Sequence, residues 1–168
     1  IINRISNIRV SGRLELLPNM GQKFNIMIDY AHTPNGIINL LNFINTLNIN
    51  RSIVVIGSAG ERDYLKRPIM GKTVVDNASY AIFTYEDPRS EEPIDIINMM
   101  TSEIKDHNNY EVVVDRSLAI KRAIDMAVDA ASGFGRGDKF ILERLKEMNK
   151  TTFLLINKVD QIKKDELL

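Results

Sequence analysis

The chain has 168 residues, enough for one domain with a hydrophobic core, and its 44% hydrophobic and 26% charged residues are typical of a globular protein. It carries 22 Lys and Arg against 22 Asp and Glu, and a formal net charge of zero gives no support to nucleic-acid binding on a basic surface. It has no cysteine, which excludes disulfides and thiolate metal sites, and no apolar run approaches the roughly 20 residues that span a bilayer.

Strands and helices alternate along most of the chain. After an extended lead-in or short strand at 8–17, the apolar runs predict strands over 24–29, 52–57, 80–84 and 111–114. Apolar residues at helical spacing predict helices from 33 or 34 to 47 and over 68–78, 93–104 and 117–127. This succession predicts an α/β fold: a single three-layer, Rossmann-like domain with a mostly parallel sheet of about five or six strands.

The last forty residues have a different pattern. Residues 128–138 are rich in glycine and predict a loop, and residues 139–148 predict an amphipathic helix. A further buried strand is expected over 152–157, followed by a turn and a short helix at 163–168.

Charged side chains follow three successive predicted strands. Because the carboxyl ends of parallel strands meet at one edge of a sheet, and ligands bind at that edge in open α/β folds, we expect these side chains to lie together. Cations and carboxylates in one place suit a zwitterionic or polyanionic ligand. The alternative is that they are solvated loop charges that pair with one another. The residues are Asp29, Tyr30 and His32; Arg62, Asp63, Lys66 and Arg67; and Glu86, Asp87 and Arg89.

Several shorter patterns carry less chemistry. Gly71-Lys72-Thr73 lacks the earlier glycine and the preceding strand of a phosphate loop, so Lys72 is predicted to be a surface helix residue. His32 is a candidate base or nucleotide contact, or it merely satisfies backbone groups at a helix start. The two histidines, His32 and His107, have no metal-ligand spacing, so we expect no metal site.

Five ordered motifs resemble the C-terminal domain of the Mur ligases, over about residues 8–127, and in particular that of the ligase adding the third amino acid of the cell-wall peptide. These motifs are Gly12–Glu15, Asp29–Pro34, Gly60–Asp63 with Lys66–Pro68, Glu86–Arg89 with Glu91–Pro93, and Asp115-Arg116. The resemblance implies a bacterial, cytoplasmic enzyme that forms an amide through an acyl phosphate, using ATP and Mg²⁺.

The resemblance also implies roles for individual residues. Arg13 would contact the ATP phosphates and Asp29 the ribose, while Tyr30 and His32 would line the nucleotide edge. The incoming amino acid would be held by Arg62 and by the loop Glu86-Asp87-Pro88-Arg89.

The usual diaminopimelate-type loop of the family is Asp-Asn-Pro-Arg. Here Arg89 is retained and would pair with the distal carboxylate, but the two altered positions leave the amino acid open, with a lanthionine-like analogue as an alternative. The family's phosphate loop, magnesium ligands and nucleotide-sugar site lie in earlier domains. The chain also begins with Ile1 and is expected to be a fragment that is inactive alone.

Residues 128–168 resemble part of the G domain of Era-type GTPases. Asn157, Lys158 and Asp160 match the guanine-reading pattern after a predicted strand, but without a phosphate loop we expect negligible GTP binding. The sequence thus predicts a chimera in which 128–168 complete the domain of 1–127. The alternatives to a ligase fragment are a structural chimera without activity and, less favoured, a guanine-nucleotide-binding module.

Overall fold

The computed structural model describes residues 12–18, 24–47, 49, 51–127 and 151–156. Within them, six strands form one sheet in the order β1-β2-β6-β3-β4-β5. The strands are β1 (Glu15–Leu16), β2 (Phe24–Asp29), β3 (Arg51–Ile56), β4 (Tyr80–Phe83), β5 (Tyr110–Val112) and β6 (Thr151–Ile156). The helices are α2 (Pro34–Thr46), α3 (Lys66–Asn77), α4 (Pro93–Thr101) and α5 (Arg116–Ala127).

The sheet is mixed, and β6 is the reason. Strands β3, β4 and β5 pair in parallel, whereas β6 lies between β2 and β3 and is antiparallel to both. The α/β class is confirmed, but three of the five neighbouring pairs, including β1 with β2, are antiparallel, so the expectation of a mostly parallel sheet needs correction. An apolar run reads the same in either strand direction, and an antiparallel strand satisfies the backbone groups of both neighbours equally well.

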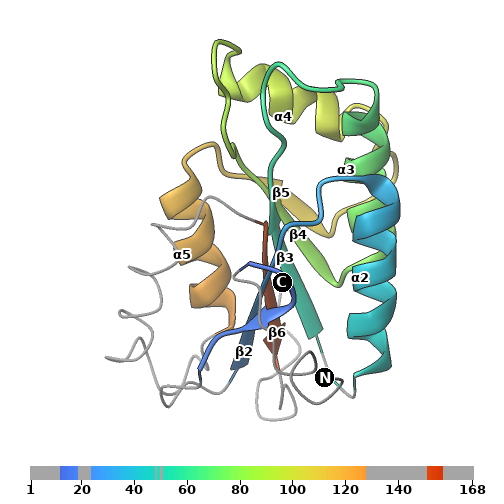
Figure 1. Ribbon diagram of the computed structural model, residues 1–168, viewed down its shortest axis with the longest axis vertical. Coiled ribbons are helices and arrows are strands. Elements are labelled where there is room, and N and C mark those ends of the chain that lie inside the picture. Colours follow the sequence, from blue (N-terminus) through green and yellow to red (C-terminus); the bar gives the residue numbers. More distant parts are fainter. Residues whose placement is uncertain (1–11, 19–23, 48, 50, 128–150, 157–168) are drawn as a thin grey trace, which may run out of the picture.

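One face of the sheet packs against α5. Alternate residues of a strand point to opposite faces, and Ile53 and Val55 of β3 join Ile82 of β4 on this side. The inner face of α5 completes the cluster with the small side chains Ala119 and Ala123 and with larger apolar ones. Figure 1 shows α5 on the left of the sheet, opposite α2 and α3.

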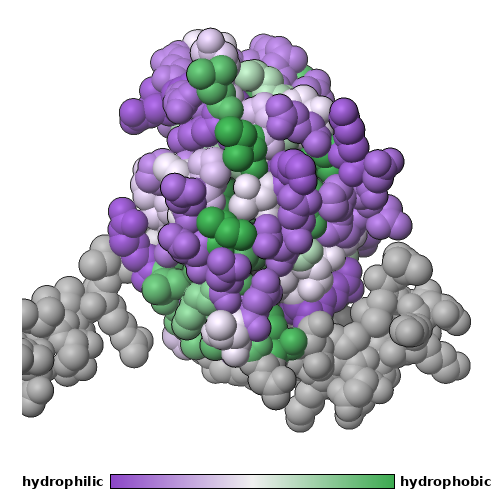
Figure 2. All heavy atoms as spheres, turned by 90° about the vertical axis from the view of Figure 1, so that its right-hand side faces the viewer, coloured by the Kyte–Doolittle hydropathy of each residue, from purple (hydrophilic) through white to green (hydrophobic). Residues whose placement is uncertain are grey.

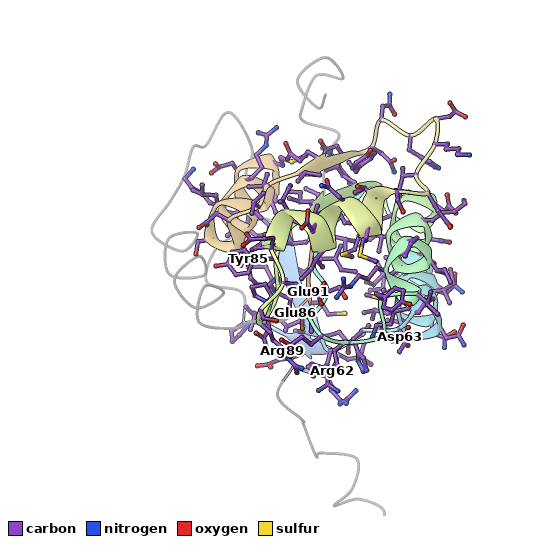
Figure 3. All side chains as sticks on the ribbon, turned by 90° about the horizontal axis from the view of Figure 1, so that it is seen from above. Arg62, Asp63, Tyr85, Glu86, Arg89 and Glu91 are labelled. Carbon is purple, nitrogen blue, oxygen red and sulfur yellow. The ribbon has the colours of Figure 1, made fainter. Side chains whose placement is uncertain are left out.

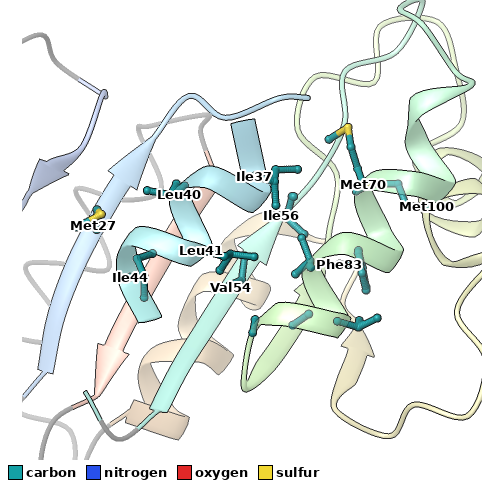
Figure 4. Close-up of a cluster of buried hydrophobic side chains, with 14 of the residues drawn as sticks. Met27, Ile37, Leu40, Leu41, Ile44, Val54, Ile56, Met70, Phe83 and Met100 are labelled. Carbon is teal, nitrogen blue, oxygen red and sulfur yellow. The ribbon is translucent and has the colours of Figure 1, made fainter. Parts of the chain in front are cut away.

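The other face of the sheet carries the larger core. Val54 and Ile56 of β3 and Phe83 of β4 point to this side, where they pack against α2, α3 and α4 (Figure 4). Helices on both faces make three layers, as the strand–helix alternation predicts. None of the described helices is long and apolar enough to cross a membrane.

Helix α2 begins directly after the Asp-Tyr-Ala-His segment. The Thr33 side chain accepts a 3.2 Å hydrogen bond from the Gly36 amide, and Pro34 occupies the first turn, where its missing N–H costs nothing. The inward residues recur at helical spacing, and they are Ile37, Leu40, Leu41 and Ile44. Capping and spacing therefore fix where this helix starts and which face it buries.

The predicted boundaries hold to within a few residues, with two informative differences. Helix α3 begins at Lys66, two residues before Pro68, which brings Arg67 into its first turn. Helix α4 ends at Thr101 rather than at 104. The helices expected over 139–148 and 163–168 lie outside the described residues.

The surface over α2 and α3 carries a run of apolar groups among charged ones (Figure 2). Large exposed apolar side chains of this part of the chain are Phe43, Leu65, Ile69 and Ile94. Exposed apolar residues are ordinary on protein surfaces, so this run does not by itself assign a partner.

Candidate functional site

A cavity of about 350 Å³ lies where the loops after β2, β3 and β4 meet. Its size is within the range of small-molecule sites, and this edge is where α/β sheets bind ligands. Its wall combines cationic, acidic and apolar groups, which suits a ligand that carries both charges. The lining residues are Tyr30, His32, Ser58, Ala59, Arg62, Asp63, Lys66, Met70 and Glu86.

The loops after β3 and β4 are in direct backbone contact beside this cavity. The Gly60 amide donates a 2.7 Å hydrogen bond to the Asp87 carbonyl. A Cβ on Gly60 would lie 2.0 Å from the Pro88 carbonyl oxygen, and one on Gly57 would lie 2.7 Å from that of Thr84. Only glycine allows backbones to approach this closely, so these two residues bring the loops together.

Tyr30 and His32 form the side of the cavity that follows β2. Their ring centroids are 5.1 Å apart, and the Arg13 guanidinium lies 5.5 Å from the Tyr30 ring centroid, in the range of a cation–π contact. His32 Nδ1 lies 2.9 Å from the Tyr30 carbonyl oxygen. A carbonyl can only accept, so Nδ1 donates and Nε2 of the neutral ring remains an acceptor.

Asp29 shapes the chain that precedes it. One of its carboxylate oxygens, Oδ2, accepts a 2.8 Å hydrogen bond from the Leu14 amide. Leu14 has a φ of 45° and Gly12 a φ of 74°, so this turn uses the left-handed region twice. The carboxylate therefore holds the turn that carries Arg13 beside Tyr30.

Glu86 is a carboxylate that lines the cavity, as Asp63 does. Burial raises the pKa of Glu86, and the positive charges of Arg116 and Lys66 act in the opposite direction, as does that of His32 in its protonated form. Arg116 is only 4% exposed, and its Nη1 donates to the Tyr85 carbonyl at 3.4 Å. A buried cation next to this loop keeps a negative charge at position 86 tolerable.

The buried Arg67 and the partly exposed Glu91 form an ion pair between the two loops. Both Nη atoms of Arg67 donate to the Glu91 carboxylate, at 2.7 and 2.8 Å, and Arg67 is 1% exposed. The Arg67 hydrogen bonds, together with the one from the Glu61 amide, lower the pKa of Glu91 to about 2. Arg67 also donates to the Ala59 carbonyl at 3.2 Å, so it contacts both loops.

Arg89 projects beside these carboxylates. Its Nη1 lies 3.8 Å from Glu61 Oε2, and its Nε lies 3.7 Å from Asp87 Oδ2. Seen from above, Arg62, Glu86, Arg89 and Glu91 gather on one side of the domain (Figure 3). Loose, partly exposed pairs of this kind contribute little stability, so Arg89 can exchange its partners for a ligand carboxylate.

The family model "Mur ligase, glutamate ligase domain" matches residues 12–132. The chain belongs to the Mur ligase family. It is 40% identical over 126 residues to the UDP-N-acetylmuramoyl-L-alanyl-D-glutamate--2,6-diaminopimelate ligase of Clostridium perfringens. The matched residues make up 74% of this chain and 26% of that protein. The enzyme of the same name from Listeria monocytogenes is 43% identical over 118 residues, or 70% of this chain and 24% of that protein.

Solved structures agree with this assignment. A structure of UDP-N-acetylmuramoyl-L-alanyl-D-glutamate--2,6-diaminopimelate ligase matches with a TM-score of 0.59 and 30% identity, over 71% of this chain and 24% of that one. Folylpolyglutamate synthase from Thermotoga maritima matches with a TM-score of 0.53 and 21% identity, over 71% of this chain and 27% of that one. It shares the fold. The chain spans about a quarter of the length of the curated relatives that it matches.

The Mur ligase fold brings most of the predicted residues to one region. Tyr30, His32, Arg62 and Glu86 line the cavity itself. Arg13 and Asp29 lie behind Tyr30, while Asp87, Pro88 and Arg89 lie beside the cavity in the loop after β4. The residues that match the guanine-reading pattern lie outside the described residues; they are Asn157, Lys158 and Asp160.

Two residues central to this arrangement were missing from the predicted site. Arg67 was noted only as a loop charge and Glu91 only as part of a motif, yet they join the loops. A signal was available: Arg67 stands at helical spacing with the inward residues Met70, Gly71 and Val74. A cation on the inner face of a helix requires a carboxylate partner, and the sequence does not say which one.

The Era-type resemblance of residues 128–168 receives no support from these comparisons. The family match runs to residue 132, past the predicted junction near 127. Only β6 of that segment, Thr151–Ile156, is among the described residues, and it occupies a central place in the sheet. The chimera, and the division into segments 1–127 and 128–168, stay predictions.

Proposed function

We propose that this chain is the ATP- and amino-acid-binding lobe of a ligase that adds a diaminopimelate-like third residue to a UDP-N-acetylmuramoyl dipeptide. The observation that carries the proposal is the cavity at the sheet edge with Arg62 and Glu86 in its wall and Arg89 beside it. The Clostridium perfringens and Listeria monocytogenes enzymes, whose names give this reaction, are 40% and 43% identical to the chain over the matched residues.

The side after β2 is the proposed nucleotide contact. Arg13 offers a planar cation for phosphate oxygens and is held against Tyr30, so it needs little ordering on binding. His32 presents an acceptor, Nε2, because its other nitrogen donates to Tyr30. Asp29 is the proposed ribose contact. Its Oδ2 already accepts from the Leu14 amide, so the ribose hydroxyls would donate to Oδ1 or to the remaining lone pair of Oδ2.

The side after β3 and β4 is the proposed amino-acid contact. Arg62 and Arg89 would each bind a carboxylate, and the carboxylates of Glu86 and Asp87 would accept from an ammonium group. An amino acid with two amino and two carboxylate groups matches this mixture better than a simple anion does. The Asp87 carboxylate 3.7 Å from Arg89 Nε favours a ligand whose charged groups alternate.

The described residues fit ATP better than they fit its metal ion. Arg62 and Lys66 both line the cavity, whereas no group of three or more His, Cys, Asp or Glu among the described residues could ligate a metal. In the proposed reaction ATP supplies the phosphoryl group that activates the acceptor carboxylate. Because transfer of that group depends on a metal and on positioned phosphate-binding groups, we propose that this chain binds its ligands but does not turn over alone.

The test is calorimetric titration of the chain with diaminopimelate, lysine, ATP and GTP. We expect binding of diaminopimelate and ATP, weaker binding of lysine because it lacks the distal carboxylate, and no binding of GTP. The Arg89→Gln variant should lose the preference for diaminopimelate over lysine, whereas Arg122→Gln, far along α5, should keep it. Equal affinities for the two amino acids in the unmodified chain would refute the proposed use of Arg89, and amide formation by the chain alone would refute its incompleteness.

A further inference from the structure

Arg89 lies in a tight turn that ends at Glu91. The Glu91 amide donates a 3.0 Å hydrogen bond to the Pro88 carbonyl, and this closes the turn. Arg89 has a φ of 52°, a left-handed conformation that a long side chain rarely adopts without support. The direction of the Arg89 guanidinium therefore depends on what holds the two ends of the turn.

The first end of the turn is held by the backbone. Pro88 packs against Gly60, and the Gly60 amide donates to the carbonyl of Asp87. None of these contacts involves Arg89 itself. The second end is held by a side chain, because the Glu91 carboxylate accepts hydrogen bonds from both Nη atoms of the buried Arg67.

Glu91 also fixes the residue opposite Arg89. Its Oε1 accepts a 2.5 Å hydrogen bond from the Glu61 amide, and Glu61 has a φ of 52°, the same left-handed region. The Glu61 carboxylate accepts from Ser90 and lies 3.8 Å from Arg89. Two unusual backbone conformations in separate loops are thus joined through one carboxylate.

We propose that Arg67 and Glu91 are positioning residues, which hold the 88–91 turn and Glu61 so that Arg89 presents its guanidinium to a ligand carboxylate. Arg67 is 1% exposed and donates to Glu91 and to the Ala59 carbonyl, so the pair would act on a ligand through the turn and Arg89 rather than by direct contact. Binding through Arg89 rests on the proposed function, whereas the anchoring of the turn does not. A buried arginine is suited to this task because its planar fork fixes a carboxylate in orientation as well as in place.

Glu91→Gln tests the anchor, with Glu92→Gln as the matched control. The neighbouring Glu92 is exposed and makes no side-chain capping bond to α4. Glu92→Gln therefore removes the same negative charge as Glu91→Gln but leaves the Arg67–Glu91 ion pair intact. Residue-resolved hydrogen exchange of the whole chain is the readout that needs no ligand. We expect the Glu61 amide to exchange about 10-fold faster or more in Glu91→Gln, with β3 core amides within about 2-fold of the unmodified chain.

The outcomes separate the two claims. Unchanged exchange at Glu61, or an equal rise in the β3 amides, would overturn the positioning role, because the pair would then be dispensable or would only support global stability. Titration with diaminopimelate adds the functional reading: Glu91→Gln should bind about 10-fold more weakly and Glu92→Gln normally, with ATP affinity unchanged in both. If the unmodified chain binds no diaminopimelate, the proposed function fails, and the exchange result still decides whether the turn is anchored.

Discussion

Replacement of Gly60 by alanine is a sharp test of how the loops after β3 and β4 are joined. A Cβ at this position would lie 2.0 Å from the Pro88 carbonyl oxygen and 2.6 Å from its carbon. Both atoms belong to the backbone, so no side-chain rotation relieves the overlap. The loops must separate, and the 2.7 Å hydrogen bond from the Gly60 amide to Asp87 is stretched or lost.

The expected cost follows from three contributions. Overpacking costs about 1–3 kcal/mol, and loss of the hydrogen bond costs about 0.5–1.5 kcal/mol. Alanine also restricts the unfolded chain, which restores about 0.4–1 kcal/mol. The central values give a net loss of about 2 kcal/mol in the free energy of unfolding, or a fall in Tm of about 4–8 °C for a domain of this size.

Urea unfolding followed by circular dichroism measures this loss, and Gly36→Ala is the control. A Cβ on Gly36 would meet the Thr33 hydroxyl at 3.1 Å and otherwise ordinary contacts, and the residue lies in α2, where alanine is favoured. We expect Gly36→Ala to stay within about 1 kcal/mol of the unmodified chain. A Gly60→Ala free energy within about 0.5 kcal/mol of the unmodified value would refute the close approach of the loops.

Three further predictions concern the core, the ion pair and ligand choice. Leu41→Ala, at a fully buried position of α2, should lower the free energy of unfolding by about 2–5 kcal/mol in the same assay, whereas Phe43→Ala, 45% exposed, should change it by about 0.5 kcal/mol or less. Because the pKa of Glu91 falls from 4.5 to about 2 on folding, its contribution to stability is full above pH 4.5 and is lost as the pH falls toward 2. In Glu91→Gln the free energy of unfolding should therefore fall less between pH 4.5 and pH 2 than it does in the unmodified chain. The same pH dependence in both would contradict the Arg67–Glu91 ion pair. Asp87→Asn removes a carboxylate that is proposed to accept from the ligand's ammonium group and should weaken diaminopimelate binding by about 2–5-fold in calorimetry. Tighter binding would show instead that Asp87 only competes with the ligand for Arg89, which lies 3.7 Å away.

The candidate site was predictable where it depends on strand ends. Tyr30, His32, Arg62 and Glu86 lie in the loops after β2, β3 and β4, and the carboxyl ends of these strands bring them to one cavity. Short-range signals also located helices, as with the Thr33 cap and Pro34 at the start of α2. These features need only local sequence, because the end of an apolar run and the cap of a helix are each set within a few residues.

Pairings between distant segments were not predictable in the same way. The sequence shows that Arg67 lies on the inner face of a helix, but its partner, Glu91, is 24 residues away on another loop. Asp29 stays a predicted ribose contact, but nothing in the sequence indicated that one of its oxygens accepts a hydrogen bond from the Leu14 amide, 15 residues away. Such contacts depend on how loops approach, which no local pattern records.

The α/β class, the succession of strands and helices, the sheet edge that carries the charged residues, and membership of the Mur ligase family all follow from the sequence. The antiparallel direction of β6 between β2 and β3, and the pairing of the buried Arg67 with Glu91, are visible only in the folded domain. Both have the same cause. Hydrophobic periodicity specifies which side of an element is buried, whereas strand direction and ion pairing depend on hydrogen-bonding partners that meet only when the chain has folded.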